Sequence, residues 1–243
     1  MPLSAVDLLN AWEVGLDQPP PARALLLLAA AAPATPPDVW PALTVGRRDM
    51  ALLDLYAALF GPHIDAVADC PACGGRVEFD APVAALTVDP GPGEVAELTA
   101  GGYRLRLRPP TSADLLALGN AADATAAEAL LLARCVGVER AAEGGPPPPA
   151  DQLPAPVIAA AVSALAEMDP AADLRFDLVC PACGHGWEPL FDVAAFLWAA
   201  VERWALLTLR DVHQLALAYG WREGDVLALS PLRRQLYLEM AYG

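Results

Sequence analysis

The pentapeptide Cys-Pro-Ala-Cys-Gly occurs twice in this chain, at 70–74 and at 180–184. In each CxxC turn both sulfurs can face one ion, and two such turns together supply the four soft ligands of a closed tetrahedral zinc site. The predicted metal ligands are Cys70, Cys73, Cys180 and Cys183. Because four thiolates leave zinc no open position for water or substrate, we expect one structural zinc ion per chain.

The similarity between the two halves continues past the cysteines. Glu78 aligns with Glu188, and after a short gap Phe79-Asp80 aligns with Phe191-Asp192. Each half therefore predicts a metal-binding knuckle between two short strands, at 66–69 and 76–79 in the first half and at 174–179 and 185–190 in the second. Two such hairpins would bind one ion across a pseudo-twofold axis.

The sequence leaves two other uses of these cysteines open. A rubredoxin-like iron centre uses nearly the same turn, and the two pairs could also act as independent redox dithiols. Neither CxxC opens a helix in a strand–helix–strand unit, which disfavours the redox alternative. We expect His185, next to Cys183, to be a solvated neighbour of the site rather than a ligand. Cys135, within an apolar run, is expected to be a small buried core residue.

Composition sets limits on compartment and partners. With 243 residues, 56% hydrophobic and 19% charged, the chain is expected to be globular, with one large domain or two smaller ones. Cysteines in ligand spacing do not indicate a disulfide framework, so the predicted compartment is the reducing cytoplasm. A net charge of -15 disfavours nucleic acid as a partner. The apolar run at 24–34 lacks the basic flank of an export signal and is too short to span a membrane, so it is interpreted as a buried helix.

Hydrophobic periodicity and turn residues predict a mainly helical fold with small β elements. A β-hairpin is expected over 94–107, turning at Gly101-Gly102, and a loop over 143–149. Helices are predicted at 4–14, 22–32, 48–60, 111–118, 124–136, 155–168, 193–219, 225–229 and 232–241. The resulting fold class is a helical scaffold around a split four-cysteine zinc ribbon, with an α+β insertion between the two knuckles.

This pattern divides the chain into five regions. The predicted regions are an N-terminal helical region at 1–65, the first half of the ribbon at 66–80, the insertion at 81–173, the second half of the ribbon at 174–192, and a C-terminal helical region at 193–243.

Three places are candidate contact surfaces. The second strand of the hairpin carries three alternating arginines, Arg104, Arg106 and Arg108. One interpretation is that they contact a phosphate or an acidic partner, and the other is that they keep a strand edge solvated. Arg233 and Arg234, together with the apolar face of the helix at 193–219, are candidates for partner contacts, although both could also pack and solvate within one subunit.

No catalytic site is expected. The chain has three histidines, none in a recognisable catalytic setting. It also lacks a nucleophile elbow, a phosphate-binding glycine loop and an H-E-x-x-H motif. The sequence therefore predicts a protein that is not an enzyme.

Several segments together resemble a known family. They are VGRRDMALLDLYAALFG at 45–61, DCPACG at 69–74, YRLRLRPPTSADLLAL at 103–118, VCPACGHGW at 179–187 and the C-terminal segment at 209–243. This set resembles zinc-ribbon proteins encoded with contractile phage tails and phage-like contractile injection systems, which are similar to tailed-phage baseplate hub assembly proteins. The most distinctive part is the C-terminal pattern Leu215, Ala216, Tyr219, Gly220, Trp221, Leu229, Arg233, Arg234, Tyr237 and Leu238.

The resemblance implies an assembly factor or minor structural component that acts at the baseplate or tail. Its partners would be proteins of that assembly, and the chain could be incorporated into the particle. The resemblance supplies no catalytic residues. A nucleic-acid-binding zinc-ribbon regulator is the alternative, kept open by the arginines of the hairpin.

Overall fold

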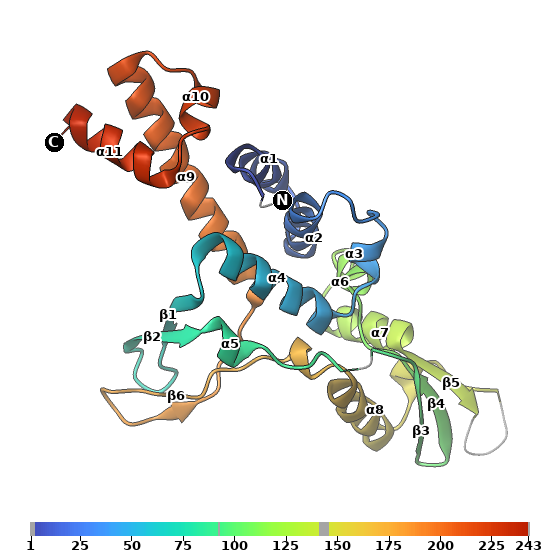
Figure 1. Ribbon diagram of the computed structural model, residues 1–243. Coiled ribbons are helices and arrows are strands. Elements are labelled where there is room, and N and C mark those ends of the chain that lie inside the picture. Colours follow the sequence, from blue (N-terminus) through green and yellow to red (C-terminus); the bar gives the residue numbers. More distant parts are fainter. Residues whose placement is uncertain (1–2, 92, 141–145, 243) are drawn as a thin grey trace. The chain divides into compact units, whose positions relative to one another are not determined.

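The computed structural model describes residues 3–91, 93–140 and 146–242 (Figure 1). These residues form mostly helices with small antiparallel sheets, which confirms the mainly helical fold class. The chain divides into two compact units, Met1–Ala34 with Ala194–Gly243, and Thr35–Val193. The finer division into five regions stays a prediction.

The unit made from the two ends of the chain is helical. Its helices are α1 (Ala5–Gly15), α2 (Pro20–Ala31), α9 (Val193–Tyr219), α10 (Glu223–Leu227) and α11 (Pro231–Tyr242). The Ser4 hydroxyl accepts a hydrogen bond from the Asp7 amide at 3.1 Å and caps α1. Helix α2 begins two residues earlier than expected because proline fits the first turn of a helix, where its missing N–H is not needed.

Packing in this unit combines a small apolar core with one arginine contact. Leu9 of α1, Ala205 of α9 and Leu227 of α10 form the core. Arg23 donates hydrogen bonds to the carbonyls of Gly15 and Leu16 at 3.0 and 2.9 Å, so its guanidinium satisfies the end of α1. The same guanidinium lies 4.7 Å from the centroid of the Trp198 ring.

The predicted apolar stripe on α9 is confirmed over most of its length. Val201, Ala205 and Leu215 are fully buried, whereas Tyr219 is 40% exposed. Gly220 follows the helix with a φ of 68°, the left-handed conformation that ends helices at glycine.

The second unit holds the strands. Its helices are α3 (Val39–Ala42), α4 (Val45–Phe60), α5 (Val83–Leu86), α6 (Ser112–Leu118), α7 (Ala124–Cys135) and α8 (Ala155–Met168), with 3-10 turns η1 (Ala150–Gln152) and η2 (Pro170–Ala172). Its strands are β1 (His63–Asp69), β2 (Arg76–Pro82), β3 (Ala96–Ala100), β4 (Tyr103–Leu107), β5 (Val136–Arg140), β6 (Leu178–Val179) and β7 (Gly186–Trp187). They pair as β1-β2, β3-β4-β5 and β6-β7, all antiparallel.

The three-stranded sheet contains the predicted hairpin and one strand that the sequence reading missed. Strands β3 and β4 turn at Gly101 and Gly102, both with positive φ, as expected. The predicted helix at 124–136 ends at Cys135, and β5 follows at once. Val136 pairs with Leu107 and Val138 with Leu105, so the valines alternate toward the core as in a strand.

The core of this sheet lies under α7 and α8. Leu105 and Leu107 of β4 pack with Val157 and Ala161 of α8 and with Leu132 of α7. Of the loop expected over 143–149, residues 143–145 lie outside the described residues, and 146–149 have no regular secondary structure.

A buried carboxylate near the end of the insertion binds the start of α4. Asp169 is 2% exposed, and its Oδ2 accepts a hydrogen bond of 2.9 Å from the amide of Gly46, 123 positions away. The amide belongs to the first turn of α4, where the helix dipole favours a negative group. With Thr44 as a second cap, α4 begins at Val45, three residues before the predicted start.

Replacing Gly46 by alanine should destabilise the protein by about 2–3 kcal/mol. A Cβ at this position would overlap the Asp169 carboxylate and approach the Ala171 Cβ to 2.8 Å. Urea unfolding followed by circular dichroism measures the loss. Gly137→Ala is the matched control, because its Cβ would make only ordinary contacts of 3.7 and 3.8 Å with Arg106. Equal stability of Gly46→Ala and the unsubstituted protein would contradict the Asp169 cap.

A second buried pair predicts a pH effect on stability. Burial raises the pKa of Asp49 to about 6 from an ordinary 3.8, although Arg48 beside it at 2.7 Å opposes the shift. The native carboxyl therefore keeps its proton at pH values where the unfolded chain releases it. The contribution of Asp49 to stability should fall as pH rises from about 4 to 6, by up to about 3 kcal/mol.

The test compares urea unfolding at several pH values for the unsubstituted protein and Asp49→Asn. The difference in stability between the two should change across this range in favour of the variant as pH rises. Asp54→Asn, on the exposed face of the same helix, is the control and should show no such change. A constant difference for Asp49→Asn would refute the assignment.

Candidate metal centre

The first knuckle is the turn that joins β1 to β2. The Cys70 amide donates to the Gly75 carbonyl at 2.9 Å, and the Gly74 amide donates to the Cys70 carbonyl at 2.8 Å. Gly74 has a φ of 69°, a conformation that glycine adopts at little cost. The glycine after the second cysteine thus lets the chain reverse while the two sulfurs stay on one side.

The second knuckle repeats this geometry between β6 and β7. The Cys180 amide donates to the His185 carbonyl and the Gly184 amide to the Cys180 carbonyl, both at 2.9 Å, and Gly184 has a φ of 74°. The strands on either side are only two residues long, although an isolated bridge between Arg175 and Leu190 continues the pairing. The strand segments predicted on either side of each knuckle are therefore paired in both halves, more regularly in the first.

The fold brings the two knuckles together, as Figure 1 shows for the adjacent hairpins. The Sγ atoms of Cys70 and Cys183 are 3.7 Å apart, as are those of Cys73 and Cys180. All four sulfurs lie within 4.8 Å of one another. A tetrahedron with metal–sulfur bonds of about 2.3 Å has edges of about 3.8 Å. A disulfide would need about 2.05 Å, so the four thiols have metal-site spacing and are not paired as disulfides.

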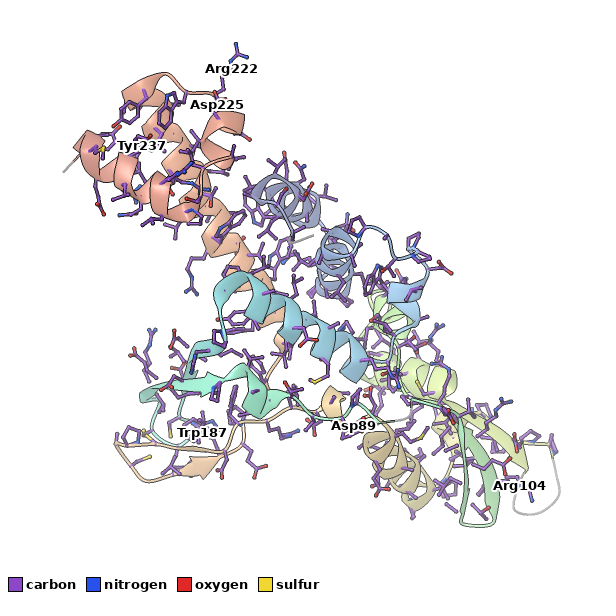
Figure 2. The ribbon with its side chains drawn as sticks, viewed as in Figure 1. Asp89, Arg104, Trp187, Arg222, Asp225 and Tyr237 are labelled. Carbon is purple, nitrogen blue, oxygen red and sulfur yellow. The ribbon has the colours of Figure 1, made fainter. Side chains whose placement is uncertain are left out.

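Burial differs between the two cysteines of each pair. Cys70 and Cys180 are 1% exposed and pack with Val77 and Trp187, while Cys73 and Cys183 are exposed. Figure 2 labels Trp187 beside this cluster. The site therefore lies at the surface, closed beneath by a small apolar layer.

His185 lies outside the ligand cluster, as expected. Its ring is exposed and stacks on Trp187, with centroids 6.3 Å apart.

Backbone amides favour the thiolate that a metal needs. Amides of Cys183 and Ala182 lower the pKa of Cys180 to about 7. The His185 amide acts in the same direction on Cys183, but hydrogen bonding with the other thiols and burial raise its pKa to about 12. Because a thiol binds a metal as the thiolate, a bound cation would displace protons from these thiols.

Aromatic side chains make a second contact between the halves. The Phe79 ring of β2 lies 4.7 Å from Phe176, edge to face, and Phe176 lies 4.9 Å from Phe191. Such pairs add stability beyond the apolar area that they bury. The internal repeat aligns Phe79 with Phe191, but nothing in the sequence pattern predicts that the Phe176 ring lies between them.

The three arginines predicted to share an outer face differ in exposure and in partners. Arg104 and Arg106 are exposed, but Arg108 binds both carboxylate oxygens of Asp114 at 2.6 and 2.9 Å. Arg134 of α7 donates to the same carboxylate at 2.6 Å. Asp114 also completes the capping box of α6 with Thr111. Its pairing with Arg134, twenty positions away, left no local signal.

Asp114 and Cys135 show opposite responses to burial. Burial would raise the pKa of Asp114, but hydrogen bonds from Arg108, Thr111 and Arg134 hold it well below its ordinary range. Burial raises the pKa of Cys135 to about 11. Cys135 is 2% exposed, which confirms it as a core residue.

The two candidate arginines near the C-terminus also differ. Arg233 is exposed, but Arg234 is 7% exposed and lies 3.8 Å from Asp211 of α9, so it packs inside its unit and is not presented to a partner. On α9, the exposed leucines are Leu206, Leu207 and Leu217, outside the buried stripe.

Comparison with protein families gives a match over residues 27–138, a little under half of the chain, to the family described as T4 bacteriophage base plate protein. The match supports a phage baseplate-related protein. The matched region includes the first knuckle and α4, with most of the three-stranded sheet. No curated protein and no solved structure matches the chain significantly.

The match supports a baseplate-associated structural or assembly role, with phage baseplate proteins as partners. For this baseplate-related protein, the four cysteines are positioned to bind one metal ion. Within the described residues, no helix is both long and apolar enough to cross a membrane.

If both knuckles bind the same ion, disruption of either one should release it. Cys70→Ser and Cys180→Ser should each reduce bound metal from one ion per chain to less than about a tenth, because three ligands from a broken set bind far more weakly. Elemental analysis of the purified variants measures this. Cys135→Ala removes a thiol outside the cluster and should keep the full metal content. Retention of half the metal in each knuckle variant would show two separate sites.

Proposed function

We propose that this chain is a non-enzymatic, zinc-stabilised assembly factor or minor structural component of a contractile phage tail-like particle, acting at the baseplate or tail. It would act in the cytoplasm and could remain in the particle. The observation that carries the proposal is the family match over residues 27–138. The four-sulfur cluster adds the expected metal dependence.

Zinc is the metal that we propose, with Cys70, Cys73, Cys180 and Cys183 as its ligands. Four thiolates at tetrahedral spacing suit zinc, and they also suit a single iron, which is the less favoured alternative. Four protein ligands would fill the coordination sphere. The proposed ion therefore supplies structure and no site for a substrate.

The proposed role of the metal is to fix the surface of the strand-containing unit. The sulfur cluster joins positions 107 and 113 residues apart, and the Asp169 carboxylate joins a nearby part of the chain back to α4. The sulfur cluster closes a loop that contains the whole insertion at 81–173, and the Asp169 link closes one that contains most of it. A long loop closed in this way loses much of its freedom before a partner binds, which lowers the entropic cost of association.

The alternative proposal is a nucleic-acid-binding regulator. Arg104 and Arg106 remain outward and keep it testable, although Arg108 is engaged by Asp114 and the net charge of -15 opposes a polyanion. It predicts binding to duplex DNA that weakens steeply with salt.

Purification of a tagged chain from cells that produce the particle tests the assembly role. Mass spectrometry should identify sheath, tube or baseplate subunits with the unsubstituted chain. The variant Cys70→Ser/Cys180→Ser should recover at least tenfold less of them, because the metal-free surface is no longer fixed. Cys135→Ala is again the control. Recovery of DNA and no tail-like subunits would favour the regulator instead.

A second measurement separates the two forms of the proposed role. Purified particles are analysed for the chain itself. A stoichiometric copy number identifies a structural component, whereas absence from particles together with recovery of baseplate subunits from the lysate identifies an assembly factor. Particle formation at normal levels in cells that lack the chain would contradict both forms.

A further inference from the structure

A basic pocket lies where β4, β5 and the end of α7 meet. Its volume is about 230 Å³, and three arginines line it, Arg106, Arg108 and Arg134. Arg106 is the last outward position of β4, Arg108 directly follows the strand, and Arg134 belongs to the last turn of α7. Figure 2 labels Arg104 on the same sheet, and Arg104 does not line the pocket.

Two of these guanidinium groups are held in place from below. Arg108 and Arg134 both bind Asp114, whose side chain is 1% exposed, while their own side chains remain 36% and 37% exposed. Arg134 uses its Nε, and among the described residues its two terminal nitrogens have no partner. One carboxylate neutralises one of two positive charges, so donors that are already oriented remain available.

The third arginine carries no such partner. Within the described part of the chain, Arg106 is exposed and its guanidinium makes no hydrogen bond or ion pair, although Glu97 lies opposite it on β3. On its other side, Gly137 of β5 is paired with it and has no side chain. A Cβ at Gly137 would meet Arg106 atoms only at 3.7 and 3.8 Å, so the glycine leaves the space above the strand open.

The remaining wall is apolar. Val95, Leu107 and Cys135 line the other side of the pocket. Its volume is below the range of about 300–1,000 Å³ typical of sites for small organic ligands. The pocket has room for one carboxylate-bearing side chain with an apolar neighbour.

We propose that this pocket binds an acidic side chain, glutamate or aspartate, of a partner polypeptide. Charge-assisted, two-pronged hydrogen bonds from arginine suit a carboxylate. A nucleic acid fits less well, because the chain as a whole is acidic and the pocket holds one group instead of a continuous backbone. The proposal rests on the pocket alone and does not depend on the function proposed above.

The test uses the full chain and a rhodamine-labelled hexapeptide, Ser-Leu-Glu-Glu-Leu-Ser, followed by fluorescence anisotropy at low salt. The labelled peptide should bind saturably, and the matched peptide with two glutamines should bind about tenfold more weakly. Inorganic phosphate at millimolar concentration should compete, because it carries the same oxyanion chemistry.

Two variants locate the binding site without touching the Asp114 cluster. Arg106→Gln should weaken the glutamate peptide about tenfold, and Gly137→Leu should weaken it at least as much by filling the pocket without changing charge. Arg104→Gln, on the same strand but outside the pocket, should bind within about twofold of the unsubstituted protein. Circular dichroism confirms that each variant is folded.

Several results would overturn the proposal. One is the absence of saturable binding of the glutamate peptide. Another is equal affinity of Arg106→Gln and the unsubstituted protein for this peptide. A third is that the protein binds phosphate but does not bind the peptide. Tighter binding of a single-stranded oligonucleotide, lost in Arg106→Gln, would assign the pocket to nucleic acid instead.

Discussion

The strand-containing unit depends on the meeting of four sulfurs from two distant turns. The second hairpin has strands of two residues, far too short to be stable alone in water. Its position is fixed by what it binds, namely the sulfurs of the first knuckle and the ring of Phe79. A metal ion bound by both knuckles would close a loop of more than a hundred residues, and such a link restricts the unfolded chain by about 4–5 kcal/mol in the entropic account of cross-links.

Polar groups inside the unit reinforce the same closure. Asp169 joins the chain just before the second knuckle to the start of α4, and Asp114 gathers arginines from β4 and α7 at the start of α6. Both are carboxylates that would be costly to bury without partners. Each is satisfied at least in part by groups far away in the sequence, so these carboxylates specify the tertiary arrangement as well as the local caps.

Local sequence patterns predicted much of this structure. They did not predict the pairing of residues that lie far apart in the sequence. The bounds of α8 and α9 and the turn at Gly101 follow from periodicity and turn chemistry, which act within a few residues. The doubled pentapeptide predicted the sulfur cluster because its two halves carry the same signal. Strand β5 was missed because the apolar run continues unbroken from α7. The ion pairs of Asp114 with Arg108 and Arg134 were missed because no local rule joins the start of α6 to a strand end before it and to a helix end twenty residues later.

The resulting picture is of a baseplate-related chain whose proposed metal holds two halves of one unit together and leaves its surfaces for partners. Hydrogen exchange followed by mass spectrometry, with zinc-loaded and chelator-treated protein, tests this claim most directly. The account predicts that β1–β2 and β6–β7 lose protection together on metal removal, by at least tenfold in exchange rate, while α1 and α2 in the other unit change little. Loss of protection in one hairpin alone, or in neither, would contradict it.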